Sequence, residues 1–265
     1  MSVTAKTAAR KAATATIKVG GKERYHEPAP AHIEVEEFRK VVTSRRSVRK
    51  FTSKPIPQAV LDDCLDMALL APCSSGLQPW EFYVVRSSDK KAKLVKACMS
   101  QLAAKTAAEL IVCVARTDRV DDFSRKMLRE WPMPDVPTLV KRYYQLIPYN
   151  YSPGPLNSFA MVKKAAFAVG GLVAPVPRGP YTSAEVQLWA AKSAALACEN
   201  LVLAFRAHGF DTCMMEGYDE VRVRKLLKLS DEAFPIMVVG AGERAEDGVF
   251  WPQIRFEREL FVHEV

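Results

Sequence analysis

A decapeptide of small residues at positions 71–80, APCSSGLQPW, separates two stretches with different hydrophobic periods. Before it, apolar side chains recur at three- and four-residue steps from Val60 to Leu69, which predicts an amphipathic helix ended by Pro72. After it, residues 81–86 are aromatic and β-branched, which predicts a strand. The decapeptide is therefore a loop fixed between two rigid elements, a position that suits ligand binding.

This loop offers polar groups at its centre and an aromatic wall at its exit. Ser74 and Ser75 carry hydroxyls, Gly76 leaves its backbone N–H accessible, and Trp80 closes the segment. Taken alone, the same residues would equally suit a plain turn between a helix and a strand.

A basic cluster lies about 25 residues upstream, at the end of a helix predicted from Ile33. It reads Arg45-Arg46-Ser47, with Arg49 two residues later. The planar fork of arginine gives two charge-assisted hydrogen bonds to a phosphoryl group, so the cluster suits the anionic end of a cofactor. Without the later loop, a solvated basic turn would explain it.

Two further segments follow the long apolar helix predicted from Ser183 to the stop at Gly209. Residues 211–219, DTCMMEGYD, end in a glycine-containing turn, and residues 251–256, WPQIRF, place Arg255 near the end of the chain. The long helix suits an internal core or, because of its many alanines, close approach by a partner helix.

Together, R-R-S-x-R-x-F at 45–51, A-P-x-S-x-x-x-Q-P-W at 71–80, E-G-Y-D at 216–219 and P-x-x-R at 252–255 resemble the nitroreductase family of FMN flavoproteins. The resemblance covers residues 34–117 and 183–260. It implies an α+β fold with a central mixed β-sheet flanked by helices. It also implies an intertwined homodimer with FMN between the subunits.

The resemblance assigns roles within these motifs. It implies that Arg45 and Ser47 bind the phosphate and ribityl hydroxyls, that Arg46 contributes mainly backbone, and that Arg255 returns to the phosphate. Arg49 would supply positive charge near flavin N1 and O2, which favours the anionic reduced flavin. The implied cofactor-binding set is Arg45, Arg46, Ser47, Arg49, Pro72, Cys73, Ser74, Ser75, Gly76, Gln101, Met215, Glu216, Gly217 and Arg255.

Three members of this set, Glu216, Gly217 and Gln101, are expected at the flavin ring, and the reasons differ. Backbone amides of Glu216 and Gly217 would donate to flavin N5, the atom that accepts hydride. Gln101 is placed at the flavin edge only by its position between a predicted helix and strand, and an ordinary surface glutamine is the alternative.

The sequence departs from the family pattern at three positions. Gly76 stands where members often have Asn, Cys73 where they often have Ser, and Gln253 where some carry a cation. Without the asparagine amide, backbone groups or Ser75 must serve in its place.

The resemblance implies an FMN-dependent oxidoreductase that takes hydride from NADH or NADPH in a ping-pong cycle. The acceptor would be a nitroaromatic, a quinone or an enone. The flavin carries the redox chemistry, so no side chain is required as a catalytic acid or base. Two alternatives are a specialised dehydrogenase or dehalogenase of the same fold and a non-catalytic flavin-binding protein.

Residues 118–182 differ from the rest, since they hold nine of the 17 prolines and many aromatic residues. A proline-punctuated aromatic segment of this length predicts a packed excursion from the domain at 33–265. We expect its aromatic side chains to cover the flavin and select the acceptor.

The N-terminal 32 residues predict a flexible basic arm. Residues 1–24 hold six Lys or Arg and one Glu, so they contribute +5 to the net charge of +8 and leave +3 for the remainder. An organellar targeting peptide or a weak nucleic-acid-binding arm is an alternative role. Nucleic acid is otherwise not an expected partner.

Other site classes have little support. The six cysteines form no C-x-x-C pair and the four histidines show no metal-ligand spacing, which predicts free thiols and no metal. Residues 240–245, GAGERA, fit a dinucleotide fingerprint, but too few residues follow for a βαβ unit, and a turn suffices. No apolar run of 18 to 20 residues is evident, which predicts a cytoplasmic protein without a membrane partner.

Overall fold

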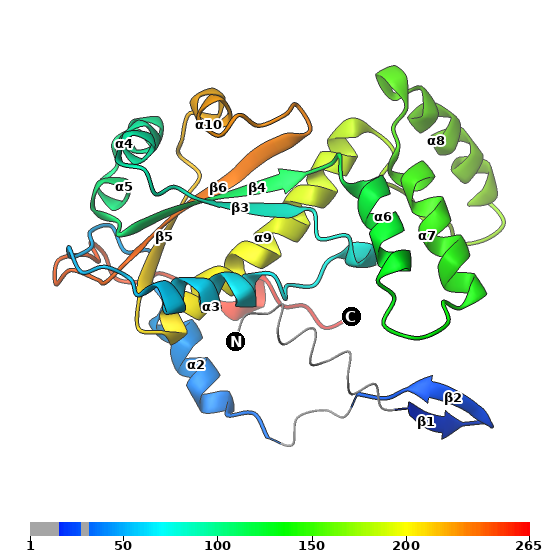
Figure 1. The fold of residues 1–265 in the computed structure, drawn as a ribbon, viewed down its shortest axis with the longest axis horizontal. Coiled ribbons are helices and arrows are strands. Elements are labelled where there is room, and N and C mark those ends of the chain that lie inside the picture. The colour runs from blue at the N-terminus through cyan, green and yellow to red at the C-terminus, as the bar shows by residue number, and fades with distance from the viewer. Residues whose placement is uncertain (1–15, 28–31) are drawn as a thin grey trace.

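The computed structural model describes residues 16–27 and 32–265, and its centre is a four-stranded sheet covered by helices on both faces (Figure 1). The strands are β3 Trp80–Val84, β4 Glu109–Arg116, β5 Asp211–Met215 and β6 Ala233–Gly242, in the order β3-β4-β6-β5. Strands β4 and β6 are the central pair and are almost wholly buried.

All pairings between these four strands are antiparallel. The parallel component of the predicted mixed sheet is an isolated bridge between Ser47 and Thr212, at the outer edge of β5. The α+β architecture with a central sheet is confirmed.

Helices cover both faces. On one face lie α2 Val35–Ser44, α3 Gln58–Ala68 and α9 Ser183–Ala207; on the other lie α4 Ser88–Ala97, α5 Leu102–Thr106 and α10 Glu220–Leu227. Helix α2 packs on α9 rather than on the sheet itself. Residues 88–106 do not form one continuous helix. They divide into α4 and α5, because Met99 and Ser100 take left-handed backbone with φ of 56° and 52°.

Helix α9 is the main helix of its face and is closed at its start by a capping box. The Thr182 side chain accepts from the Glu185 N–H at 3.2 Å while Glu185 accepts from the Thr182 N–H at 3.1 Å, so the cap is Thr182 rather than the expected Ser183. By length and composition α9 is apolar enough to cross a bilayer, contrary to the sequence expectation. Its apolar window is 56% buried in the protein.

Strand β6 continues through Gly242, so the first residues of GAGERA are strand and not the expected turn. Gly242 packs on Phe51: a Cβ there would lie 3.0 Å from three atoms of that side chain. This close approach holds the 48–51 segment on the end of the sheet.

The excursion at 118–182 folds into three helices at one end of the sheet. They are α6 Val120–Arg129, α7 Thr138–Tyr151 and α8 Ser158–Gly170, with the short η2 Pro155–Asn157 before α8. Tyr144 and Ile147 of α7 are buried and join the core around Trp189. In contrast, α8 buries only Ala160.

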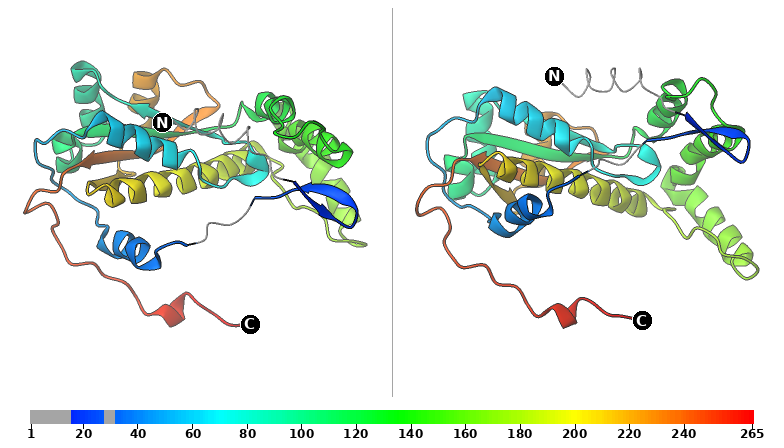
Figure 2. Two further views of the ribbon diagram at one scale, coloured as in Figure 1. Left: turned by 60° about the horizontal axis from the view of Figure 1, so that its bottom comes forward. Right: turned by 90° about the horizontal axis from the view of Figure 1, so that it is seen from below.

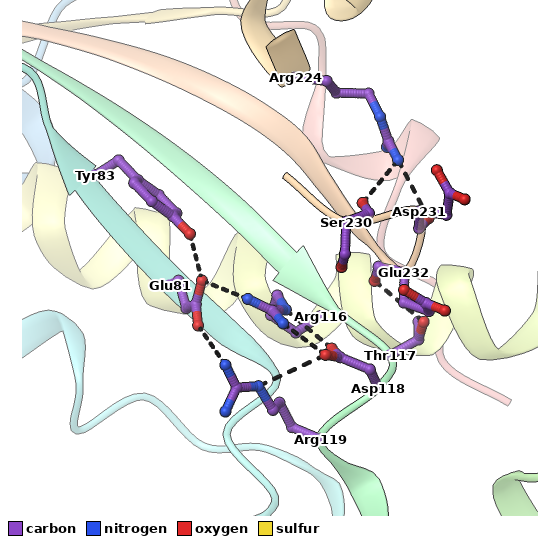
Figure 3. Close-up of polar contacts among 10 residues, drawn as sticks. All are labelled: Glu81, Tyr83, Arg116, Thr117, Asp118, Arg119, Arg224, Ser230, Asp231 and Glu232. Carbon is purple, nitrogen blue, oxygen red and sulfur yellow. Dashed lines mark hydrogen bonds and ion pairs between the residues drawn. The ribbon is translucent and has the colours of Figure 1, made fainter. Parts of the chain in front are cut away.

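A shared ion network anchors the point where the excursion leaves β4 (Figure 3). Arg116 at the end of β4 donates to Glu81 at 2.8 Å and to Asp118 at 2.9 Å, and Arg119 pairs with Glu81 at 3.5 Å. Tyr83 also donates to Glu81, at 2.7 Å. Arg116 holds the pKa of Asp118 below its usual value.

The two terminal segments lie outside the sheet. Within the predicted N-terminal arm, β1 Thr16–Val19 and β2 Lys22–Tyr25 form an antiparallel hairpin, and residues 1–15 and 28–31 lie outside the described residues. After β6 the chain extends along the body and ends near the short η3 Arg258–Leu260 (Figure 2). Among the described residues, this C-terminal tail pairs with no strand.

All six cysteines are free, as predicted, and their burial has a consequence at high pH. Burial raises the pKa of Cys64 to about 12 and that of Cys98 to about 11. Above pH 9 the unfolded chain loses these protons while the folded chain keeps them. The free energy of unfolding should therefore fall as pH rises from 9 to about 11, on the order of 3 kcal/mol.

Urea titrations at pH 8 and pH 10.5 would measure this fall. A Cys64→Ala/Cys98→Ala variant should be less stable at pH 8 because it leaves cavities, but its stability should change less between the two pH values. Equal pH dependence in both proteins would contradict the assignment.

Candidate functional site

The segment after α2 runs along the outer edge of β5. Beside the Ser47–Thr212 bridge, the Val48 N–H donates to the Thr212 carbonyl at 3.0 Å and the Arg49 N–H donates to the Gly248 carbonyl at 2.7 Å. Val48 is fully buried, which fixes this extended segment in register. Arg49 then places Nη1 3.2 Å from Cys213 Sγ.

The four basic-cluster residues and the C-terminal arginine line one pocket of about 230 Å³, as the sequence predicted they would converge. Its lining residues are Arg45, Arg46, Ser47, Arg49, Val249, Phe250, Trp251, Pro252, Gln253, Ile254 and Arg255. Four cations and no carboxylate line it, so its potential is positive and it suits a phosphate.

The arginines of this pocket differ in what they bind. Arg46 Nη1 donates to the carbonyls of Thr43 and Arg45, each at 2.7 Å, and so caps α2. Arg255 Nη1 donates to the neighbouring Ile254 carbonyl at 2.8 Å. The guanidinium of Arg46 is thus already engaged within the chain, and its expected backbone role towards FMN stays a prediction.

Gln101 contacts the turn after β5, residues 216–219. Gln101 Nε2 donates to the Gly217 carbonyl at 2.8 Å, and the Asp219 N–H donates to the Ala97 carbonyl at 2.8 Å. Glu216 and Gly217 are exposed, so their backbone can approach a ligand. Met215 is 2% exposed and its side chain packs near Gly240 in the core, which leaves only its backbone.

The Pro72–Gly76 loop is held by tyrosines of the excursion, which the sequence did not reveal. Its centre is the short η1 Ser74–Gly76, where Ser75 has a φ of 60°. The Ser75 hydroxyl lies 2.7 Å from the Tyr143 hydroxyl, and Tyr144 donates to the Ser75 carbonyl at 3.1 Å. The only signal in the sequence was the Tyr-Tyr pair inside the predicted excursion.

Cys73 in this loop does not act as a thiolate. Its Sγ accepts the Gln78 N–H at 3.1 Å, and burial raises the pKa of the thiol above its ordinary value. The thiol is therefore neutral near pH 7 and serves as a hydrogen-bond acceptor that shapes the loop.

A pocket of about 360 Å³ lies beside this loop. Gly76 and Gln78 form one side, and α6 with the turn after it contributes Phe123, Lys126, Met127, Glu130, Trp131 and Pro132. Trp131 Nε1 is buried without a hydrogen-bond partner among the described residues. The pocket thus combines apolar walls with the polar side chains of Gln78, Lys126 and Glu130.

The predicted set divides into two clusters at opposite ends of the sheet (Figure 1). The cofactor-end cluster contains Arg45–Arg49, Gln101, Glu216, Gly217 and Arg255, and the loop cluster contains Pro72–Gly76. Ser47 pairs with Thr212, and the register continues through Ala241 to Glu109. Trp80 pairs with Ala115, six residues further along β4, so the basic segment at Ser47 and the end of the loop at Trp80 are about 20 Å apart along the sheet. Met215 lies at the level of Val112, so the Glu216–Gly217 turn begins nearer the middle of the sheet.

Sequence reasoning also missed an acidic residue that supports the basic segment. Asp211 is 3% exposed, and it accepts from Arg206 at 2.9 Å and from Arg244 at 2.7 and 3.0 Å. It thereby joins the end of α9 to the end of β6. The next residue, Thr212, forms the β-bridge with Ser47. Asp211 begins the 211–219 segment, and nothing in the sequence around it indicated this role.

No group of three or more metal-ligating side chains lies together in the parts of the chain that the structure describes. His208 instead pairs with Asp63 at 2.9 Å on the surface, between α9 and α3.

Comparisons with known proteins agree with this architecture. The nitroreductase family model matches residues 42–243. NADH dehydrogenase of Thermus thermophilus is 25% identical over 232 residues, covering 88% of this chain and 98% of that protein. A Bacillus subtilis protein, YdgI, whose name places it among NAD(P)H nitroreductases, is 25% identical over 221 residues, covering 82% and 92%.

Solved structures share the fold. A structure from Exiguobacterium sibiricum, determined in complex with FMN, has a TM-score of 0.63 at 22% identity and covers 86% of this chain and 97% of its own. The nitroreductase family protein of Streptococcus pneumoniae has a TM-score of 0.63 at 23% identity, with 88% and 100% covered. Because the family model spans most of the chain, this protein belongs to the nitroreductase family.

Proposed function

We propose that this family member, an FMN-dependent NAD(P)H oxidoreductase, binds FMN between two copies of the chain and reduces a nitroaromatic, quinone or related acceptor in a ping-pong cycle. The observation that carries the proposal is the division of the predicted site into two clusters, with the basic segment and the end of the loop about 20 Å apart along the sheet. A two-fold dimer brings the loop cluster of one copy to the cofactor end of the other.

The residues at the cofactor end fit FMN. The arginine-lined pocket would hold its phosphate through Arg45, Ser47 and Arg255. Arg49 would place positive charge at the ring, and the exposed Gly217 backbone leaves room for close approach. Bound FMN would supply hydride acceptance and release, so the protein need only bind, orient and tune it.

The pocket beside Gly76 supports a flat acceptor that carries oxygen. Phe123, Met127 and Trp131 provide apolar walls, and the side chains of Gln78 and Lys126 bring polar hydrogen atoms to the same pocket. Tyrosines of α7 hold the loop against this pocket. The excursion therefore selects the acceptor while the cofactor end stays common to the fold.

Dimers assembled from two different variants of the chain test whether each FMN site is formed by both copies. Arg45→Ala damages the cofactor end, and Ser74→Trp fills the partner's site from an exposed loop position. A dimer with one defect in each copy should keep one intact site and bind about half the wild-type FMN. A dimer with both defects in one copy should keep none.

Differently tagged copies would isolate each mixed dimer, and flavin absorbance per dimer would be read together with NADPH and NADH oxidation. The reverse pattern, with FMN retained when both defects share one copy, would place the site within a single chain. Bound flavin that neither nicotinamide reduces in stopped-flow would exclude the ping-pong cycle and leave the specialised dehydrogenase or dehalogenase.

A further inference from the structure

One stretch of the chain is free of acidic residues and basic in charge. Residues 136–184 contain Lys141, Arg142, Lys163, Lys164 and Arg178 and no Asp or Glu, although the chain has 30 acidic residues elsewhere. The stretch therefore carries +5, five cations against no carboxylates. It comprises α7, α8 and the connection to α9.

The same stretch exposes an unusual amount of apolar surface around α8. Phe159, Met161 and Val162 are all exposed, and positions two residues apart on a helix lie on nearly opposite sides. Residues 169–176, which are the end of the helix and the turn after it, are apolar and uncharged. Leu172 and Val173 in this segment are 85% and 91% exposed. A helix that is apolar on several sides normally has a partner.

Cations flank this apolar tip. The Arg178 guanidinium lies against Gly171, since its Nη2 is 2.1 Å from the position a Cβ would take there. Lys164 is exposed on α8, where it pairs with Glu185 at 3.4 Å. Figure 2 shows α8 projecting from the body at the end remote from α2 and the cofactor-end cluster.

We propose that the tip of α8, residues 169–176, docks on an anionic lipid bilayer. Apolar side chains enter the boundary between headgroups and acyl chains while Lys164 and Arg178 meet lipid phosphates; Lys163 is occupied by the carbonyls of Tyr149, Asn150 and Ser152. Such docking lies in the plane of the interface and needs no spanning segment. It is therefore compatible with a chain whose long apolar helix α9 is packed in the core.

The competing occupant is a second copy of the chain. Of the net charge of +8, residues 1–24 and 136–184 each hold +5, so the rest of a second copy carries only −2, whereas an anionic bilayer presents one negative charge per anionic headgroup over the whole contact. The acid-free composition therefore favours the bilayer.

Flotation of the purified FMN-loaded protein with vesicles would test the proposal. The protein should float with vesicles of phosphatidylcholine and phosphatidylglycerol but not with phosphatidylcholine alone, and added salt should release it. Leu172→Asp/Val173→Asp should lower the partition coefficient more than about tenfold, and Arg178→Glu at least about fivefold.

Val221→Asp is the matched control, since Val221 is 75% exposed on α10, and it should float like the wild type. The N-terminal basic arm is present in every variant, so binding that survives the double substitution would belong to the arm and overturn the proposal. Failure to bind anionic vesicles, or equal binding to neutral ones, would also overturn it. So would dissociation of a dimer by the double substitution, measured by light scattering, because the tip would then be a subunit contact.

Discussion

Arg45→Ala should weaken FMN binding by roughly 10- to 100-fold, because a charge-assisted hydrogen bond to phosphate is lost. Arg45 lies at the end of α2 and lines the pocket that unites the basic cluster with Arg255. Quenching of flavin fluorescence on titration of apoprotein with FMN would measure the dissociation constant. Thermal unfolding of the apoprotein should change little.

Arg46→Ala is a matched control that removes the same charge from the adjacent position. Its guanidinium is already bonded to the Thr43 and Arg45 carbonyls, so its loss should weaken FMN binding only a few-fold through the cap of α2. If the two substitutions weaken binding equally, the pocket acts through bulk charge, and the specific role of Arg45 is wrong.

Asp211→Asn should destabilise the fold by about 2 to 3 kcal/mol, because it removes the charge that two arginines share. Asp211 is 3% exposed, while the side chains of Arg206 and Arg244 are 24% and 34% exposed, which moderates the loss. Urea unfolding followed by circular dichroism would measure the change. FMN binding should weaken as well, because Thr212, the residue after Asp211, forms the β-bridge that positions Ser47.

Asp89→Asn provides the comparison for a surface pair. Asp89 is 72% exposed and pairs with Lys93 at 2.7 Å, so its neutralisation should cost less than about 1 kcal/mol. A similar loss in both variants would show that the Asp211 pair contributes no more than an ordinary surface contact.

The sequence predicted those elements whose residues repeat with a clear period. The helix predicted from Val60 to Leu69, the strand predicted over 81–86 and the long helix from Ser183 all appear, as α3, β3 and α9. Motif spacing also brought Arg45, Ser47 and Arg255 to one pocket.

Other features depend on tertiary contacts that leave little trace in the sequence. The break between α4 and α5 rests on positive φ at Met99 and Ser100, residues that rarely take that conformation. The three tyrosine contacts of the Ser74–Ser75 loop come from α7, about 70 residues away. The sheet register that separates the two clusters is likewise set by pairing between distant strands.

The split between the cofactor-end cluster and the loop cluster has a thermodynamic consequence. If FMN contacts both clusters only across a dimer, nucleotide affinity and subunit association are linked and must strengthen each other by the same factor. Dilution would then release the nucleotide, and its removal would promote dissociation into single chains. The holoprotein concentration in an assay thus becomes a variable that sets how much of the enzyme is active.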